Sequence, residues 1–222
     1  MRSRSSTSFE PVRIPHQLKG ATGAIAAATV IVSLLIFLLA ATTNAAVLMG
    51  FVPARFGGTL AVSPAVPALL TPLSATLVHG SLLHLAGNLL MLMWCGLAVE
   101  RVLGAGPTIL LYAVGAYVAA AAQFLVAPHS VDPMIGASGA ISALIGAYAL
   151  SYGQHKQIVK GRALNRWLNG AWLLVAWVMI QVGFGYVMGQ QGMLLATPAH
   201  IGGFIAGVAM QRPLLLWRYR KA

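Results

Sequence analysis

Charge is the property that this sequence has least of. Only 8% of its 222 residues are charged and Asp and Glu together number three, whereas 59% are hydrophobic. A soluble domain usually carries about 25% charged residues, so this chain has too few polar side chains to cover a water-soluble core. We therefore expect lipid as its solvent, and we predict one polytopic helical domain without a separate soluble module.

Cysteine is almost absent as well. The single one, Cys95, lies in an apolar run, which excludes a disulfide within the chain and a cysteine-based metal cluster. The His-Glu-x-x-His pattern of zinc hydrolases is also missing. We predict neither a metal nor a cofactor.

Because acids are so scarce, the formal net charge is +11. A strongly basic balance raises nucleic acid as a partner. Here, however, the basic residues sit in short segments between apolar runs, and no basic face alternates with exposed aromatic residues. Orientation in a membrane explains them better, so the predicted partner is the lipid bilayer and not nucleic acid.

What the sequence does contain is a series of apolar runs. A membrane span needs about 20 mainly apolar residues, and we predict an all-α membrane protein with six transmembrane helices, over residues 21–43, 74–99, 108–126, 136–152, 167–188 and 197–210. The connection 50–73 is rich in proline but still apolar, and we expect it in the membrane interface. The predicted six-helix core is 21–212, between a cytoplasmic N-terminal tail, 1–20, and a basic cytoplasmic C-terminal tail, 213–222.

The basic residues also predict the orientation of this bundle. Six spans put both termini on one side, and with the termini inside, all of the 14 Lys and Arg residues except Arg55 fall in inside segments. We predict a multi-pass protein with both termini cytoplasmic. The lack of a long, serine-rich and arginine-rich presequence favours a bacterial inner membrane. The runs 74–99, 136–152 and 197–210 then all start near the outer face.

Unusual polar residues gather at those three starts. His84 and Asn88 are four residues apart and share one helix face, Ser138 opens the second run, and His200 lies in the first turn of the third. Polar groups at this depth usually face the bundle interior and mark function, although hydrogen bonding between helices explains His84 and Asn88 equally well. A small face with Gly203 and Gly207 in 197–210 matches one in 136–152, made by Gly139, Ala143, Gly146 and Ala147.

If those two faces pack together, Ser138 meets His200. A serine hydroxyl becomes a nucleophile when a base takes its proton, and a neutral imidazole is such a base near pH 7. Glu10 and Glu100 are predicted on the inner side and Asp132 in an outer loop, so the residues favour a Ser–His dyad over a triad. The candidate donors to an oxyanion are the Ser138 amide, His84 and Asn88.

These stretches together resemble the rhomboid family of intramembrane serine proteases. The matching segments are His79-Gly80 with His84 and Asn88, Gly136-Ala137-Ser138-Gly139, and Ala199-His200-Ile201-Gly202-Gly203. The resemblance implies a six-helix fold in which Ser138 is the nucleophile and His200 the general base. It also implies an oxyanion hole formed by His84, Asn88 and the Ser138 amide, and a site backbone with Gly136 and Gly139 that turns toward the substrate carbonyl.

The resemblance further implies a function. Substrates would be transmembrane proteins that are cut near the outer face, with 50–73 as an interfacial loop and with 167–188 and 189–192 as gate and cap. One departure is Ser142, where many members have an aromatic residue that stacks on the catalytic histidine. Glu100-Arg101 is expected to anchor the inner end of its helix.

Three other hypotheses stay open at this point. A rhomboid-like binder of transmembrane segments without catalysis would be expected to lack Ser138 or His200. A transporter with histidine proton sites would need polar groups through the whole membrane depth, and a zinc hydrolase would use His79, His84 and His200. No pattern predicts the physiological substrate, the oligomeric state or the group that orients His200.

Overall fold

The computed structural model describes residues 20–58, 60–63, 65–153, 160–190 and 196–220. Within these ranges the regular structure is helical, apart from one isolated bridge between Phe51 and Met134. The long helices are α1 (Ala21–Leu38), α5 (Leu82–Met91), α6 (Leu97–Leu103), α7 (Ala105–Val126), α8 (Ser138–Tyr152), α9 (Arg162–Gln190) and α10 (Thr197–Arg218). The π-helical segment η4 (Leu92–Gly96) joins α5 to α6 without a break, and the predicted helical class is confirmed.

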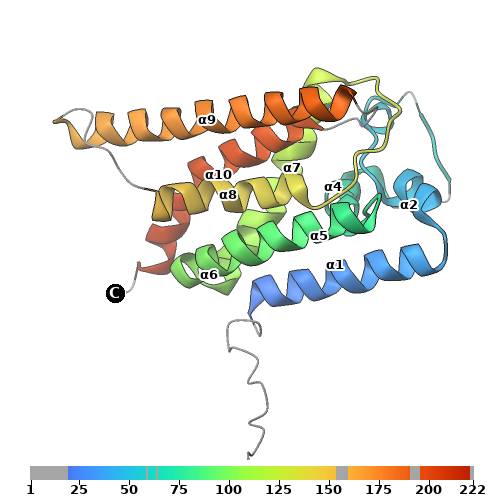
Figure 1. Ribbon diagram of the computed structural model, residues 1–222, viewed down its shortest axis with the longest axis horizontal. Coiled ribbons are helices and arrows are strands. Elements are labelled where there is room, and N and C mark those ends of the chain that lie inside the picture. Colours follow the sequence, from blue (N-terminus) through green and yellow to red (C-terminus); the bar gives the residue numbers. More distant parts are fainter. Residues whose placement is uncertain (1–19, 59, 64, 154–159, 191–195, 221–222) are drawn as a thin grey trace, which may run out of the picture.

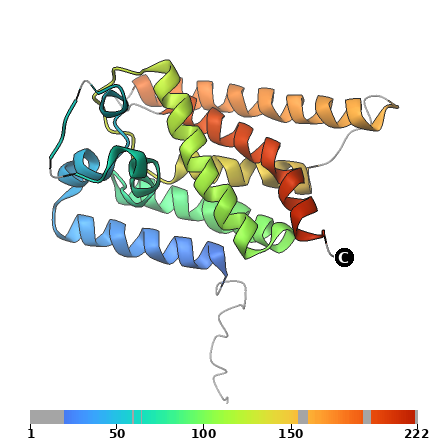
Figure 2. The same cartoon turned by 180° about the vertical axis from the view of Figure 1, so that it is seen from behind.

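The helices form a bundle with a distinct centre and two edges. Figure 1 shows α1 along one edge and α9 along the opposite edge, with α5, α8 and α10 between them, and Figure 2 shows α7 crossing the bundle on the other side. The main core cluster joins residues of η4, α6, α7, α8 and α10, including Leu92, Val99, Leu111, Ile141 and Leu144. This core surrounds the N-terminal half of α8.

Three of the described helical stretches are long and apolar enough to cross a membrane. They are Ala21–Leu38, Leu82–Leu103 and Ala105–Val126, with mean hydropathies of 2.4, 1.8 and 2.0. α8 and the segment Leu168–Gly183 of α9 are apolar but shorter, so the count of six spans stays a prediction. Large apolar side chains such as Leu38, Leu83 and Leu125 are more than three-quarters exposed, as expected of a lipid-facing surface.

The packing of α8 against α10 is the closest approach in the bundle centre. A side chain at Gly203 would collide with the backbone carbonyl of Gly139, and one at Gly207 would collide with that of Ala143. From the other helix, a side chain at Gly146 would collide with the backbone of Phe204. The two backbones therefore touch directly, and the predicted pairing of the two small faces is confirmed.

Several predicted helix boundaries are wrong at their N-terminal ends. The run predicted to start at 74 contains the short helices α4 (Thr71–Ser74) and η3 (Ala75–Leu77), and the long helix begins only at Leu82. Ser81 is extended and its side chain accepts the backbone N–H of His84, so a serine cap sets this start. The run predicted to start at 136 begins at Ser138, after a positive φ of 105° at Gly136.

The other predicted ends also shift. α1 stops at Leu38 and a separate helix α2 (Thr42–Met49) follows a positive φ at Ala40, whereas α9 and α7 each start a few residues earlier than predicted. The connection 50–73 holds α3 (Pro53–Phe56) and η2 (Ala68–Leu70). Most of the predicted N-terminal tail, with Glu10, and residues 191–192 of the predicted cap lie outside the described residues.

The predicted helix end at 210 is wrong as well, whereas the assignment of 213–222 to a basic cytoplasmic tail stays a prediction. α10 continues through Pro213 to Arg218. Tertiary contacts compensate for the backbone hydrogen bond that proline removes: Leu214 is buried, and the Arg218 guanidinium donates to the Arg101 carbonyl over 2.8 Å.

Glu100 ties the first helix to the bundle. Its two carboxylate oxygens accept the backbone N–H groups of Ala21 and Thr22 over 2.7 and 2.8 Å. The N-cap residue of α1, Gly20, offers no side chain for this purpose, so Glu100 satisfies helix donors that would otherwise be unpaired. The structural role predicted for Glu100 is confirmed.

Candidate active site

Ser138 is held where an extended loop turns into α8. The loop pairs with the connection before α3, because Phe51 and Met134 exchange two backbone hydrogen bonds of 3.0 and 2.8 Å. The N–H of Gly136 then donates to the Ala75 carbonyl over 2.9 Å, and its positive φ reverses the chain. Ser138 follows as the first residue of α8 and is partly buried.

His200 reaches this serine from the first turn of α10. Its ring nitrogen Nε2 lies 2.7 Å from Ser138 Oγ, within the range expected of a hydrogen bond to a hydroxyl. The imidazole is only 9% exposed. Because the α8 and α10 backbones touch below this point, the two side chains meet without a long reach from either helix.

His84 lies against the backbone just before the serine. A Cβ on Gly136 would be 2.7 Å from both Cε1 and Nε2 of the His84 ring, so the ring occupies the space that a side chain at 136 would need. The cap made by Ser81 fixes the first turn of α5 from which His84 projects. The structure thus brings His84 to the same small region as Ser138 and His200.

Asn88 joins this region through His84. Its Nδ2 donates to the His84 backbone carbonyl over 2.9 Å, and its side chain is 7% exposed. Among the described residues Asn88 makes no hydrogen bond to Ser138 or His200, and its buried Oδ1 has no partner. One N–H of the amide is therefore used within α5, and the second is free to serve another acceptor.

His79 is separated from the dyad by its own contacts. It is fully buried outside α5, and its Nδ1 lies 3.0 Å from Ser33 Oγ. That hydroxyl donates to the Leu77 carbonyl, so it accepts from His79. The ring meets His84 edge-on, with centroids 5.0 Å apart, and no group of three or more His, Cys, Asp or Glu among the described residues is placed to hold a metal.

Gly139 and Ser142 sit at the α8–α10 contact rather than on the histidine ring. A side chain at Gly139 would lie 2.7 Å from the Ala119 Cβ of α7. Ser142 is buried, and its hydroxyl donates back to the Ser138 carbonyl over 2.8 Å. Ser142 therefore offers no group to orient His200.

Gln181, which none of the sequence motifs indicated, contacts the other side of His200. Its Oε1 lies 2.6 Å from His200 Nδ1, and its side chain is 7% exposed. Among the described carboxylates neither Glu100 nor Asp132 hydrogen-bonds to His200, and Asp132 is exposed in a turn with Ser130. The available signal was that Gln181 is the single amide side chain in the apolar stretch 170–189.

A small cavity adjoins the dyad. Its volume is about 20 Å³, and its lining includes Gly136, Ser138, Ala196 and His200. A space of this size holds one water molecule.

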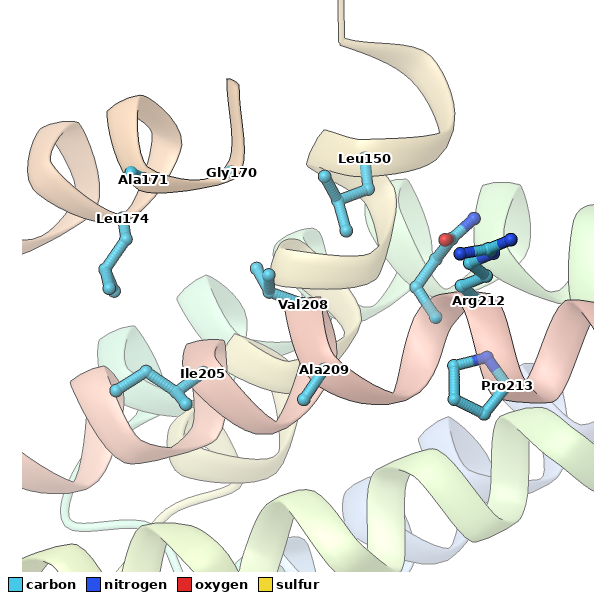
Figure 3. A pocket seen from close by; sticks show the side chains of 10 residues that line it. Leu150, Gly170, Ala171, Leu174, Ile205, Val208, Ala209, Arg212 and Pro213 are labelled. Atoms are coloured by element: carbon cyan, nitrogen blue, oxygen red, sulfur yellow. The ribbon is translucent and has the colours of Figure 1, made fainter. Parts of the chain in front are cut away.

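A larger cavity lies elsewhere, between α8, α9 and α10 (Figure 3), and contains neither Ser138 nor His200. Its volume is about 490 Å³, and it is lined mainly by apolar residues: Leu150, Gly170, Ala171, Leu174, Ile205, Val208, Ala209, Gln211, Arg212 and Pro213. It shows that part of α9 stands away from α8.

The chain is similar in sequence to a family model and to several curated proteins. A family model described as a rhomboid domain matches residues 66–217. The rhomboid protease GluP of Bacillus subtilis (strain 168) is 31% identical over 140 residues, which are 63% of this chain and 24% of that protein. The rhomboid protease GlpG of Pectobacterium atrosepticum is 32% identical over 137 residues, which are 62% of this chain and 45% of the relative. The rhomboid-related protein 2 of Mus musculus is 28% identical over 144 residues, 62% of this chain and 45% of the relative. The matches thus span less than half the length of these curated relatives.

Proposed function

The chain belongs to the rhomboid family, and from this premise we propose that it is an intramembrane serine endopeptidase that cleaves transmembrane proteins. Family membership and the exposed apolar helices make it an integral membrane protein. The observation that carries the proposed activity is the 2.7 Å contact between Ser138 Oγ and His200 Nε2. A hydroxyl and an imidazole at this distance are ready for proton transfer.

Acylation begins at this contact. His200 Nε2 takes the hydroxyl proton as Ser138 Oγ attacks the scissile carbonyl carbon, which leaves a tetrahedral oxyanion. The imidazolium then gives that proton to the leaving amine as the C–N bond breaks, and an ester on Ser138 remains. In the second half a water attacks the ester, His200 takes its proton, and the proton returns to Ser138 Oγ as the acid leaves.

The oxyanion needs donors that are already in place. Ser138 is the first residue of α8, so its backbone N–H is one of the four that have no acceptor within the helix. The positive end of the helix dipole lies at the same point. His84, against Gly136, and the second Asn88 N–H are the side-chain donors of the proposed oxyanion hole, and each donor contributes about 10²–10³ in rate.

Water and substrate also need access. The cavity beside Ser138 and His200 has room for the one water that deacylation requires. We place this site near the outer face of a bacterial inner membrane, with cytoplasmic termini, as the basic residues favour. The site needs neither a metal nor a cofactor for this chemistry.

The decisive experiment uses the purified full chain in detergent. A fluorophosphonate probe should label the wild type and should not label Ser138→Ala, which should also fail to cleave a model transmembrane substrate. Ser151→Ala is the matched control, because Ser151 lies on the same helix and bonds to the Ala147 carbonyl away from the dyad. Cleavage that persists in Ser138→Ala would sink the serine mechanism. A folded wild type that is never labelled would favour a non-catalytic binder of transmembrane segments.

A further inference from the structure

We propose that Gln181 is a positioning residue that fixes the proton of His200 on Nδ1 and so turns Nε2 toward Ser138 as a base. This inference rests on the proposed function and names a component of the same site that lies outside the three sequence motifs around His84, Ser138 and His200. In this proposal α9 orients His200 for catalysis, in addition to packing against the bundle.

The geometry engages both nitrogens of one ring. Nδ1 lies 2.6 Å from Gln181 Oε1, and Nε2 lies 2.7 Å from Ser138 Oγ. A neutral imidazole carries one proton, on either nitrogen. A carbonyl oxygen only accepts, so the Gln181 contact requires the proton on Nδ1. Nε2 is then left with the lone pair that must take the serine proton.

The choice of an amide has a physical reason in this location. His200 and Gln181 are both more than nine-tenths buried. A carboxylate at position 181 would have only the Nδ1–H group of His200 to offset its desolvation, which lowers stability, whereas an amide is buried at a much smaller cost. Ser142 bonds to its own helix, and among the described side chains Gln181 is the one that contacts His200 Nδ1.

α9 holds the histidine at a second point. Trp177, one turn before Gln181, donates its indole N–H to the His200 backbone carbonyl over 3.2 Å. Its ring also stacks on Phe204 of α10, with centroids 5.3 Å apart and planes 13° apart. Nearer the N-terminal end of α9, Ala171 and Leu174 lie across the larger cavity from Ile205 and Val208 of α10 (Figure 3). Seating of α9 at Trp177 and Gln181 therefore orients His200, and displacement of α9 there releases the ring.

The reverse orientation of the amide makes the opposite prediction. If the Gln181 NH₂ group faced Nδ1, then Nδ1 would accept, Nε2 would carry the proton, and Ser138 would have no base. Replacement by glutamate separates the two cases, since a carboxylate can accept from Nδ1–H but has no NH₂ to donate.

The test compares three variants of the full chain in detergent. Gln181→Met keeps the length of the side chain and removes the acceptor, and Gln181→Glu keeps an acceptor. Met179→Leu is the control, because Met179 is on the same helix but 68% exposed. We expect Gln181→Met to lower kcat by about 10- to 100-fold, part of the 10²–10⁴ that general base catalysis supplies, with KM and the thermal unfolding midpoint unchanged.

Rescue of kcat by Gln181→Glu distinguishes a positioning role of Gln181 from a merely structural one. Gln181→Glu should keep kcat within about threefold of the wild type, because an orienting acceptor remains. Wild-type kcat in Gln181→Met, or equal loss of kcat in both Gln181 variants with normal folding, would overturn the inference. If either of these results is obtained while Ser138→Ala is still inactive, the proposed protease function stands without the role of Gln181. Cleavage by Ser138→Ala would contradict both the protease mechanism and the role of Gln181.

Discussion

Replacing Gly136 by alanine tests whether the backbone before Ser138 and the ring of His84 work as one unit. Two separate effects are built into this position. Its φ is +105°, which costs a residue with a Cβ about 1–3 kcal/mol. In addition, the new Cβ would lie 2.7 Å from two atoms of the His84 ring, whereas ordinary contacts begin near 3.4 Å.

The second effect predicts a loss of rate beyond the loss of stability. Relief of the collision moves either the ring or the loop by about 0.7 Å, the difference between those two distances, and a shift of 1 Å is enough to cost about 10²-fold in a reaction that depends on alignment. We expect kcat/KM of Gly136→Ala to fall by about 10²-fold or more. The free energy of unfolding should fall by about 1–3 kcal/mol from the backbone strain and by about 1–3 kcal/mol from the collision.

A second glycine isolates the strain from the collision. Gly58 also has a positive φ, of 70°, but nothing lies within 4 Å of the Cβ that it would gain. Gly58→Ala should therefore lower stability and leave kcat/KM of the folded enzyme unchanged. Cleavage of a model substrate and thermal unfolding are measured on both variants. Equal kcat/KM values for Gly136→Ala and wild type would refute the assignment of His84 to the site.

Three further substitutions test the proposed oxyanion donor Asn88, the contact of Glu100 with α1, and the contact between α8 and α10. Asn88→Ala should lower kcat by about 10²–10³, the contribution of one oxyanion donor, without abolishing cleavage; an unchanged kcat would remove Asn88 from that role. Glu100→Gln should lower the free energy of unfolding by about 1–3 kcal/mol, because a charged acceptor of two N–H groups is lost, and probe labelling of the protein that stays folded should not change. Gly203→Ala should separate α8 from α10 and reduce both probe labelling and stability. Gly106→Ala is the control, because Gly106 has open space around it, and it should change neither labelling nor stability. Equal behaviour of the two variants would contradict a backbone contact.

Sequence patterns predicted the parts of the fold that depend on side-chain size. Gly203 and Gly207 predicted contact with α8 because only small residues let two helix backbones touch. Since Ser138 and His200 open those same two helices, their meeting followed from that contact. His84 lies beside Gly136, and its role in an oxyanion hole stays a prediction.

Patterns predicted less where tertiary contacts decide the outcome. Composition made 74–81 look like the start of a helix, yet Ser81 caps the helix that starts at Leu82. The last helix was predicted to end at 210, but α10 continues through Pro213 to Arg218, with contacts from Leu214 and Arg218. Gln181 went unnoticed because a uniformly apolar helix does not reveal which of its faces meets α10.

The backbone contact between α8 and α10 has a consequence for how the bilayer can act on this protein. Changes in membrane thickness or lateral pressure tilt helices and shift side chains, but two helices in backbone contact must tilt together. The distance between Ser138 and His200 should therefore change little when the lipid environment changes. Among the described residues, α9 hydrogen-bonds to His200 through two side chains, those of Trp177 and Gln181. A change of lipid would therefore reach the proposed catalytic pair through α9, as a loss of histidine orientation and not as a loss of proximity.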